Sequence, residues 1–358
     1  MLATYPIEAT EENWLSNCLT TAILARLAQL DAGEASVTFP ADVEVEYRDI
    51  ISRFTGIVER FIALADALVG LNTDQRQAVR SAIETQNRIP DIFDGATDCF
   101  ACNDALPVIH DLAKKLFEFS FGALSRIKSP GAVSSVRDVH YAIAYDQLAK
   151  KCCPFCGMER LEPHHADIPR PDLDHYLAVS LYPFCGVNLR NLTPMGDRCN
   201  SSYKLAQDIL YDQHGNRLPC YDPYGDVTAE FSLAGSIIVG TPAGAPVWIL
   251  HLGPASPQTV NWDRIFRIKL RLEQSLNAEF SSWVTEIGGV LRGLGHDLNV
   301  LEEVSKGLIQ YRTICGTESL AGIGHLKAEV AALLIQDLES DEKRERTHAF
   351  LKEAFSQP

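Results

Sequence analysis

Four short segments between residues 153 and 204 decide how this chain is interpreted. They read CPFCG at 153–157, LDHY at 173–176, NLTP at 191–194 and CNSSYK at 199–204. The region around them, Cys152 to Pro223, holds six of the ten cysteines, several prolines and only short apolar runs. Because prolines and such short runs disfavour long helices, the sequence predicts a small module that carries a site, with a helix only after Cys199.

The residue types in this module suit hydrolysis of a phosphodiester bond. That reaction needs an activated water on one side of phosphorus and charge neutralisation at the leaving oxygen on the other. Asp174 and Asn200 offer hard oxygen ligands, which Mg²⁺ and Mn²⁺ prefer. Neighbouring side chains on a strand point to opposite faces, so His175 can lie on the other side of the phosphate from Asp174. An imidazole accepts a proton near neutral pH, which makes His175 the expected general base.

Taken in order, the four segments resemble the HNH endonucleases, in particular the zinc-supported His-Asn-Asn subgroup. The resemblance implies a ββα-metal fold, in which two strands carry the Asp-His pair and the Asn-Leu segment and a helix brings Asn200 over the hairpin. Asn191 is then expected to bridge the backbone of the loop that holds His175. Lys204 follows Asn200 by one helical turn, so it shares the same face and is placed to meet a phosphate. The expected catalytic residues are His175, Asp174, Asn200, Asn191 and Lys204, with Asp174 and Asn200 on the catalytic ion.

The same resemblance implies a structural zinc ion, but the chain departs from the family at one ligand. The second knuckle of the family reads CxxC, whereas this chain has Gly196 three residues before Cys199. Cys153, Cys156 and Cys199 therefore leave a tetrahedral Zn²⁺ one ligand short. The residues that could complete the site are Cys152, His164, His165, Cys185 and Cys220, and the sequence does not choose among them.

The rest of the chain is predicted to be mainly helical. From Glu12 to Lys151, apolar residues recur at helical spacing, which predicts five or six helices. After the module, 227–239 and 247–252 predict a strand pair, and helical periodicity returns from Val260. We therefore expect an α+β protein with an inserted ββα-metal module and a short β-hairpin. Its expected domains are a helical N-terminal domain at 1–150, the HNH module at 151–225 and a hairpin with helices at 226–358.

Charge and cysteine content narrow the class of protein. Of the 358 residues, 32 are Lys or Arg and 47 are Asp or Glu, a formal net charge of −15, which excludes a protein that coats DNA with a basic surface. Glu8, Glu11 and Glu12 precede any basic residue, unlike a presequence, and no apolar run is long enough to span a bilayer. The cysteines are too sparse for a disulfide scaffold, so we expect a cytoplasmic protein.

The leading hypothesis is a metal-dependent DNA endonuclease. Because the acidic excess repels DNA away from the site, cleavage is expected to need a protein partner. HNH modules of this subtype within longer helical chains resemble nuclease subunits of bacterial anti-phage defence systems, such as Septu-type systems, in which the partner is an ATPase. That resemblance makes DNA and an ATPase the expected partners, and antiviral defence the expected role.

The alternative hypothesis is a non-catalytic zinc-ribbon adaptor built on a degenerate HNH scaffold, with Gly196 in place of a cysteine. The joint presence of Asp174, His175 and Asn200 favours the enzyme, because a purely structural module has no need of the three together. An RNA-directed nuclease would use the same chemistry, and the sequence does not separate it from a DNA nuclease.

Overall fold

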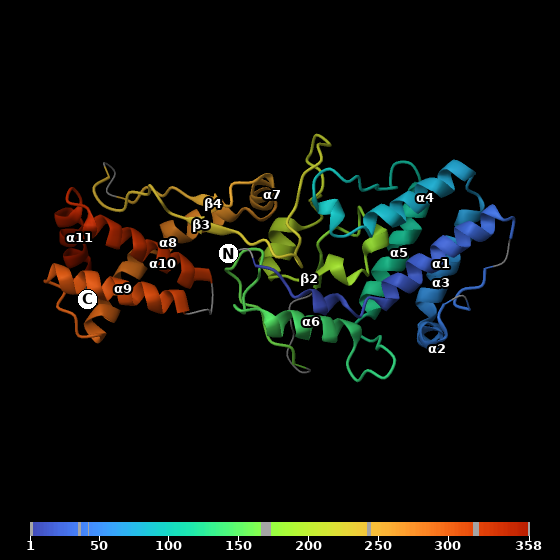
Figure 1. Ribbon diagram of the computed structural model, residues 1–358, viewed down its shortest axis with the longest axis horizontal. Coiled ribbons are helices and arrows are strands. Elements are labelled where there is room, and N and C mark those ends of the chain that lie inside the picture. The colour runs from blue at the N-terminus through green and yellow to red at the C-terminus, as the bar shows by residue number, and fades with distance from the viewer. Residues whose placement is uncertain are drawn as a thin grey trace. The chain divides into compact units, whose positions relative to one another are not determined.

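The computed structural model describes residues 3–34, 37–41, 43–165, 173–241, 245–317 and 322–356. Within these residues the chain is mainly helical and has two small antiparallel sheets (Figure 1), which confirms the mainly helical α+β class. The chain forms two compact units. The first, here called the site unit, comprises Thr4–Leu148 and Leu161–Val227, and the second, the C-terminal unit, comprises Met1–Ala3, Ala149–Arg160 and Thr228–Pro358.

The N-terminal part of the site unit contains six α-helices among the described residues, within the range that the periodicity predicts. Local signals start three of them: Asn72 and Gln75 form a capping box, Pro107 stands at a first turn, and the Ser135 hydroxyl accepts a backbone hydrogen bond. The elements are η1 (Ile7–Thr10), α1 (Trp14–Asp31), α2 (Val45–Arg53), α3 (Thr55–Val69), α4 (Thr73–Gln86), η2 (Asp91–Phe93), α5 (Pro107–Ala123) and α6 (Val136–Gln147).

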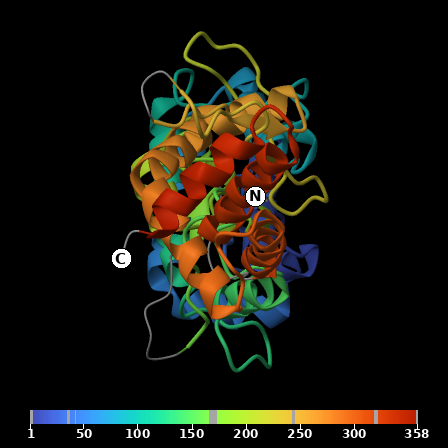
Figure 2. The same ribbon diagram turned by 90° about the vertical axis from the view of Figure 1, so that its left-hand side faces the viewer.

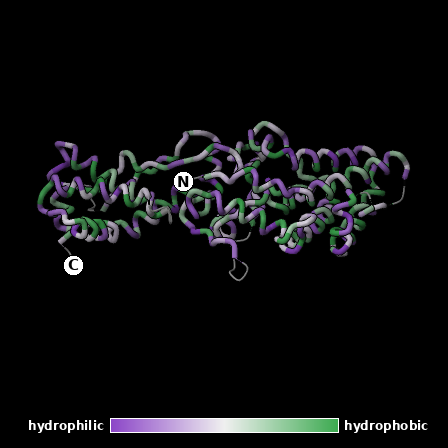
Figure 3. Tube along the Cα trace, turned by 60° about the horizontal axis from the view of Figure 1, so that its bottom comes forward, coloured by the Kyte–Doolittle hydropathy of each residue, from purple (hydrophilic) through white to green (hydrophobic). Residues whose placement is uncertain are grey.

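The core of this unit forms where α3 packs against α5. Ile57 and Phe61 of α3, and Leu116 and Phe117 of α5, are almost completely buried. Hydrophobic and hydrophilic residues alternate along the helical turns rather than forming separate blocks (Figure 3), as expected for helices with one buried face. Each buried side chain of this size contributes about 1.5–3 kcal/mol, so the helices provide a firm support for the module that follows.

The middle of the module contains a two-stranded antiparallel sheet. Strand β1 (Leu173–His175) pairs with β2 (Leu192–Pro194), which places Asp174 opposite Thr193 and His175 opposite Leu192. The loop between the strands contains two 3₁₀ turns, η3 (Pro183–Cys185) and η4 (Leu189–Asn191). In this register, the Asp-His pair of β1 lies across from Leu192 and Thr193 of the Asn-Leu segment.

The helix expected after Cys199 is much shorter than an ordinary α-helix. Residues Cys199–Lys204 form η5, a π-helical segment in which the Leu205 N–H donates to the Asn200 carbonyl at 2.9 Å. Leu205 then adopts a φ of 49°, a left-handed conformation that an L-residue with a side chain seldom takes and that ends the segment. Asn200 and Lys204 therefore share one isolated turn instead of a long helix.

The C-terminal unit contains the second sheet and five α-helices among its described residues. Strands β3 (Glu230–Ser232) and β4 (His251–Gly253) pair antiparallel, and Ile237 forms an isolated bridge with Val247, so the predicted hairpin is confirmed but has a short regular ladder. Helices α8–α11 pack side by side, as the orange and red ribbons of Figure 2 show. The helices are α7 (Pro257–Phe266), α8 (Ile268–Gly293), α9 (Leu301–Thr317), α10 (Gly322–Glu339) and α11 (Arg344–Ser356).

Every helix in the described residues is too short or too polar to serve as a membrane span.

Candidate active site

Side chains from the helices hold the β1–β2 loop in place. The completely buried Gln86 accepts from the Phe184 N–H at 2.9 Å, and the Asn87 amide donates to the Phe184 carbonyl at 3.1 Å. Three more side chains bind loop or strand backbone: His110 to the Ser180 carbonyl at 2.9 Å, Asn13 to the Leu189 N–H at 2.8 Å, and His140 to the Leu192 carbonyl at 3.0 Å. The loop is therefore built into the helical part of the site unit.

Asn191 closes the same loop from within. Its side chain is completely buried and accepts from the Leu177 N–H at 2.6 Å. Its amide group also lies 3.1 Å from the Leu177 carbonyl and 3.2 Å from the Cys185 carbonyl, both acceptors. These bonds bridge the backbone that follows His175, as the sequence predicts for this residue.

His175 is held as a neutral imidazole with a defined orientation. Its Nε2 atom lies 2.8 Å from the Gly186 carbonyl, which can only accept, so Nε2 carries the proton and Nδ1 keeps a lone pair. The Phe121 ring packs against the imidazole with 4.3 Å between ring centroids. Burial lowers the pKa of His175 to about 4, against the opposing effect of the Asp174 carboxylate. At neutral pH the imidazole is therefore neutral and keeps the Nδ1 lone pair, and its low pKa makes it a weaker base than a histidine in water.

Gly186 is a site residue that the sequence analysis missed. A Cβ at this position would lie 2.9 Å from Val179 Cγ2, 3.0 Å from the Pro183 carbonyl oxygen and 3.1 Å from Phe117 Cβ. These contacts are too close for a side chain, so only glycine lets the backbone bring its carbonyl to His175. The one signal in the sequence is a glycine directly after a Pro-Phe-Cys turn, and that signal does not identify its partner.

Asp174 forms an ion pair with Lys204. The Lys204 Nζ atom lies 2.9 Å from Asp174 Oδ2, and the two side chains are 1% and 12% exposed, respectively. Lys204 therefore points at the carboxylate instead of lying on a solvated face toward a phosphate, and any contact with phosphate would require a different position of its amine. The sequence did not reveal this pair, because it joins a strand to a turn 30 residues later, 204 − 174 = 30.

Asn200 lies in the same π-helical turn as Lys204 and is partly exposed. Its backbone N–H donates a hydrogen bond to the Gly196 carbonyl at 2.9 Å. Within the described part of the chain, its carboxamide makes no hydrogen bond to the protein, and Asp174 Oδ2 is buried with no partner other than the Lys204 ammonium group. Both groups are hard oxygen donors of the type that Mg²⁺ and Mn²⁺ accept, so these residues fit such an ion chemically.

Two arginines near the site are engaged in structural contacts. Arg190 pairs with Asp222, and Arg217 donates to backbone carbonyls, including that of Leu218 at 2.8 Å. Arg198, just before η5, lies over the Tyr203 ring at 5.9 Å from its centroid. Of these three arginines, Arg198 is the one that directly precedes the turn carrying Asn200.

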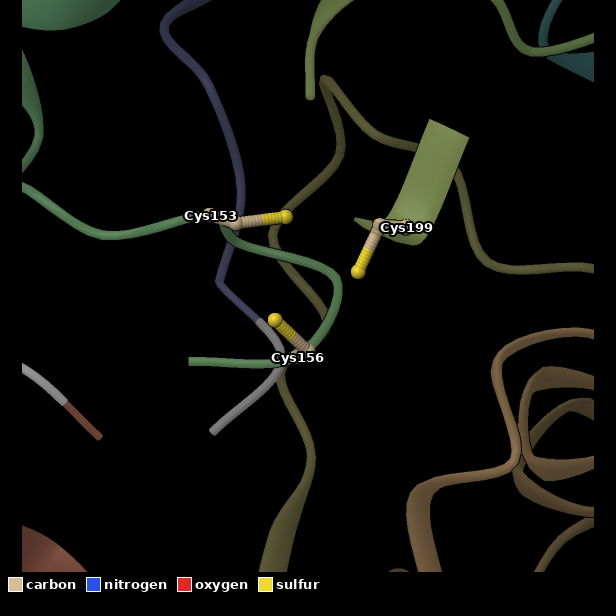
Figure 4. A group of neighbouring side chains, drawn as sticks. All are labelled: Cys153, Cys156 and Cys199. Carbon is tan, nitrogen blue, oxygen red and sulfur yellow. The ribbon is translucent and has the colours of Figure 1, made fainter. Parts of the chain in front are cut away.

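A cysteine cluster lies in the knuckle region. Cys153, Cys156 and Cys199 are buried, and their sulfur atoms lie within 4.8 Å of one another and turn toward a common point (Figure 4). Gly157 has a φ of 65°, the left-handed conformation that lets the chain turn back after Cys156. Sulfur atoms in a tetrahedral zinc site lie about 3.8 Å apart, given Zn–S bonds of about 2.3 Å. The cluster could therefore bind a metal ion such as zinc.

No fourth ligand joins this cluster among the described residues. Of the five candidates from the sequence, Cys220 donates its thiol to the Ile209 carbonyl at 2.9 Å and Cys185 donates to the Tyr182 carbonyl at 3.2 Å. Cys152, His164 and His165 also lie outside the group. The other CxxC pair, Cys99 and Cys102, consists of buried thiols, and no cysteine of the chain forms a disulfide in the described residues.

Comparison with family models, curated proteins and solved structures found no match to this chain.

Proposed function

We propose that this chain is a metal-dependent endonuclease of the HNH type that hydrolyses DNA phosphodiester bonds. The observation that carries the proposal is the neutral His175, fixed by the Gly186 carbonyl, next to Asp174 on strand β1. A general base for water needs a neutral imidazole with a free lone pair that water can reach, and His175 is neutral and partly exposed. The antiparallel pairing of β1 with β2 and the turn η5 that carries Asn200 support the ββα-metal interpretation.

In this proposal, Asp174 and Asn200 would hold one Mg²⁺ or Mn²⁺ ion. The ion would supply neutralisation of the charge that develops on the leaving oxygen. His175 Nδ1 takes a proton from the attacking water, and the Gly186 carbonyl stabilises the imidazolium that forms, through the proton on Nε2. Asn191 acts as a positioning residue, because it fixes the loop that presents the Gly186 carbonyl.

The proposed partners are DNA and a second protein. The net charge of −15 raises the electrostatic cost of bringing DNA to this chain, and a partner with a basic surface would lower that cost. An ATPase of a bacterial defence complex is the partner that the HNH resemblance implies. Equal cleavage of DNA with and without a partner would remove the need for one.

The experiment that tests the proposed function is plasmid cleavage by the purified chain, with its partner where one is found. Added Mg²⁺ or Mn²⁺ is expected to produce nicked and linear DNA. The ions should be withdrawn by dialysis and not with EDTA, because EDTA also removes zinc from thiolates. A chain that cleaves neither DNA nor RNA under any of these conditions would contradict the proposal and favour the zinc-ribbon adaptor.

We also propose that Cys153, Cys156 and Cys199 bind a structural zinc ion. Protein purified without chelators is expected to contain about one zinc per chain by elemental analysis and native mass spectrometry. Cys199→Ser should remove most of the zinc, whereas Cys18→Ser, at a partly exposed cysteine outside the cluster, should leave it unchanged. Zinc-free wild-type protein that folds normally would refute a structural role for the ion.

A further inference from the structure

The burial of Lys204 requires an explanation beyond ordinary surface charge. Lysine is almost never fully buried unless it is paired, and Lys204 is 1% exposed. Its ammonium group lies 2.9 Å from Asp174 Oδ2 and 3.4 Å from the carbonyl of Leu205, the residue that ends η5. The turn therefore directs a positive charge onto the one carboxylate of the proposed metal site.

A divalent cation would meet this ammonium group at the same carboxylate. Bound to Asp174, it would lie only a few ångströms from Lys204 Nζ, in a partly buried place where charges are screened less than in water. The carboxylate is also already neutralised, so it attracts a second cation less strongly. Lys204 consequently weakens the binding of a divalent cation, whether the amine remains in place or moves aside.

We propose that Lys204 is the resident counter-ion of Asp174 and keeps the affinity for divalent cations low until a phosphodiester arrives. This inference rests on the proposed function. A phosphodiester adds a negative charge and oxygen ligands of the kind that complete Mg²⁺ sites in proteins. With that charge present, the metal ion and the ammonium can share one site, so metal and nucleic acid bind together rather than in sequence.

The first test measures Mn²⁺ binding by electron paramagnetic resonance of the free ion. The specific signal is the difference between each protein and its Asp174→Asn counterpart, which removes the contribution of other acidic groups. Lys204→Met is expected to bind Mn²⁺ at least tenfold more tightly than wild type in the absence of DNA. Lys204→Arg keeps the positive charge and is expected to stay within about threefold of wild type. Equal or weaker binding by a folded Lys204→Met protein would overturn the inference.

The second test needs no change at Lys204, so it remains decisive if Lys204→Met does not fold. In a His175→Ala background, which lacks the proposed base, Mn²⁺ and a short DNA duplex are each expected to tighten binding of the other at least tenfold, because linkage is reciprocal. Independent binding would overturn the inference. If wild type cleaves DNA with Mn²⁺ while these tests fail, only the role of Lys204 is wrong. If Asp174→Asn binds Mn²⁺ as wild type does and no cleavage occurs, the proposed function fails as well.

Discussion

Replacing His175 with alanine is expected to reduce metal-dependent DNA cleavage by a factor of about 10²–10⁴, the usual contribution of a general base. The reason is geometric as well as chemical. The proton on Nε2 is bound by the Gly186 carbonyl, so Nδ1 of His175 is the atom that can receive the proton of water. The measurement is the initial rate of plasmid nicking at saturating Mn²⁺, with circular dichroism to show that the variant is folded.

A matched control comes from His214 in the same unit, which is exposed and whose hydrogen bonds within the described residues join it to Asp212 and Gln213. His214→Ala is expected to cleave at the wild-type rate. Gly186→Ala should resemble His175→Ala in activity, because its added methyl would force the carbonyl away from Nε2. Retention of more than about a tenth of the wild-type rate by folded His175→Ala would contradict its role as the base.

Replacing Asn191 with alanine is expected to destabilise the site unit by about 2–4 kcal/mol. The change would leave a buried N–H of Leu177 and buried carbonyls of Leu177 and Cys185 without their partner, and each unsatisfied buried group costs about 1–3 kcal/mol before relaxation. Urea denaturation gives this difference in the free energy of unfolding. The slope of the transition is expected to stay unchanged.

Asn200 provides the contrast, since its carboxamide has no partner in the described part of the protein. Asn200→Ala is expected to change stability by less than about 0.5 kcal/mol, as for other substitutions outside packed and bonded positions, and to lose cleavage. The two asparagines thus separate a residue that positions the site from one that takes part in the reaction. A stable Asn191→Ala protein, or a fully active Asn200→Ala protein, would show that the roles are assigned wrongly.

The local parts of the fold were predictable because they depend on residues close in sequence. Helical spacing of apolar residues between Glu12 and Lys151 predicted five or six helices, and the described residues contain six, α1–α6. The bridging role of the Asn191 amide, just before strand β2, followed from the HNH resemblance. Such features need only periodicity, turn chemistry and one expected pairing.

The parts that were missed depend on distant residues meeting in space. Nothing near Lys204 in the sequence indicates that it pairs with Asp174, and nothing near His175 indicates Gly186 as its acceptor. The expected helix after Cys199 is a single turn that ends at Leu205, whose positive φ is a conformation that leucine does not favour and that the sequence therefore does not indicate. The sequence therefore names candidate site residues, but it does not reveal the ion pair of Asp174 or the hydrogen bond of His175.

The most direct test of the central claim is the position of a bound ion, measured by anomalous diffraction from crystals of His175→Ala soaked with Mn²⁺ and a DNA oligonucleotide. The proposal predicts one ion about 2.0–2.3 Å from an oxygen of Asp174 and from the carboxamide oxygen of Asn200, with a phosphate oxygen also bound. The ion should face the space that the imidazole of His175 occupies in the wild-type protein. An ion bound elsewhere, or a DNA-bound structure in which Asp174 and Asn200 do not share an ion, would contradict the proposal.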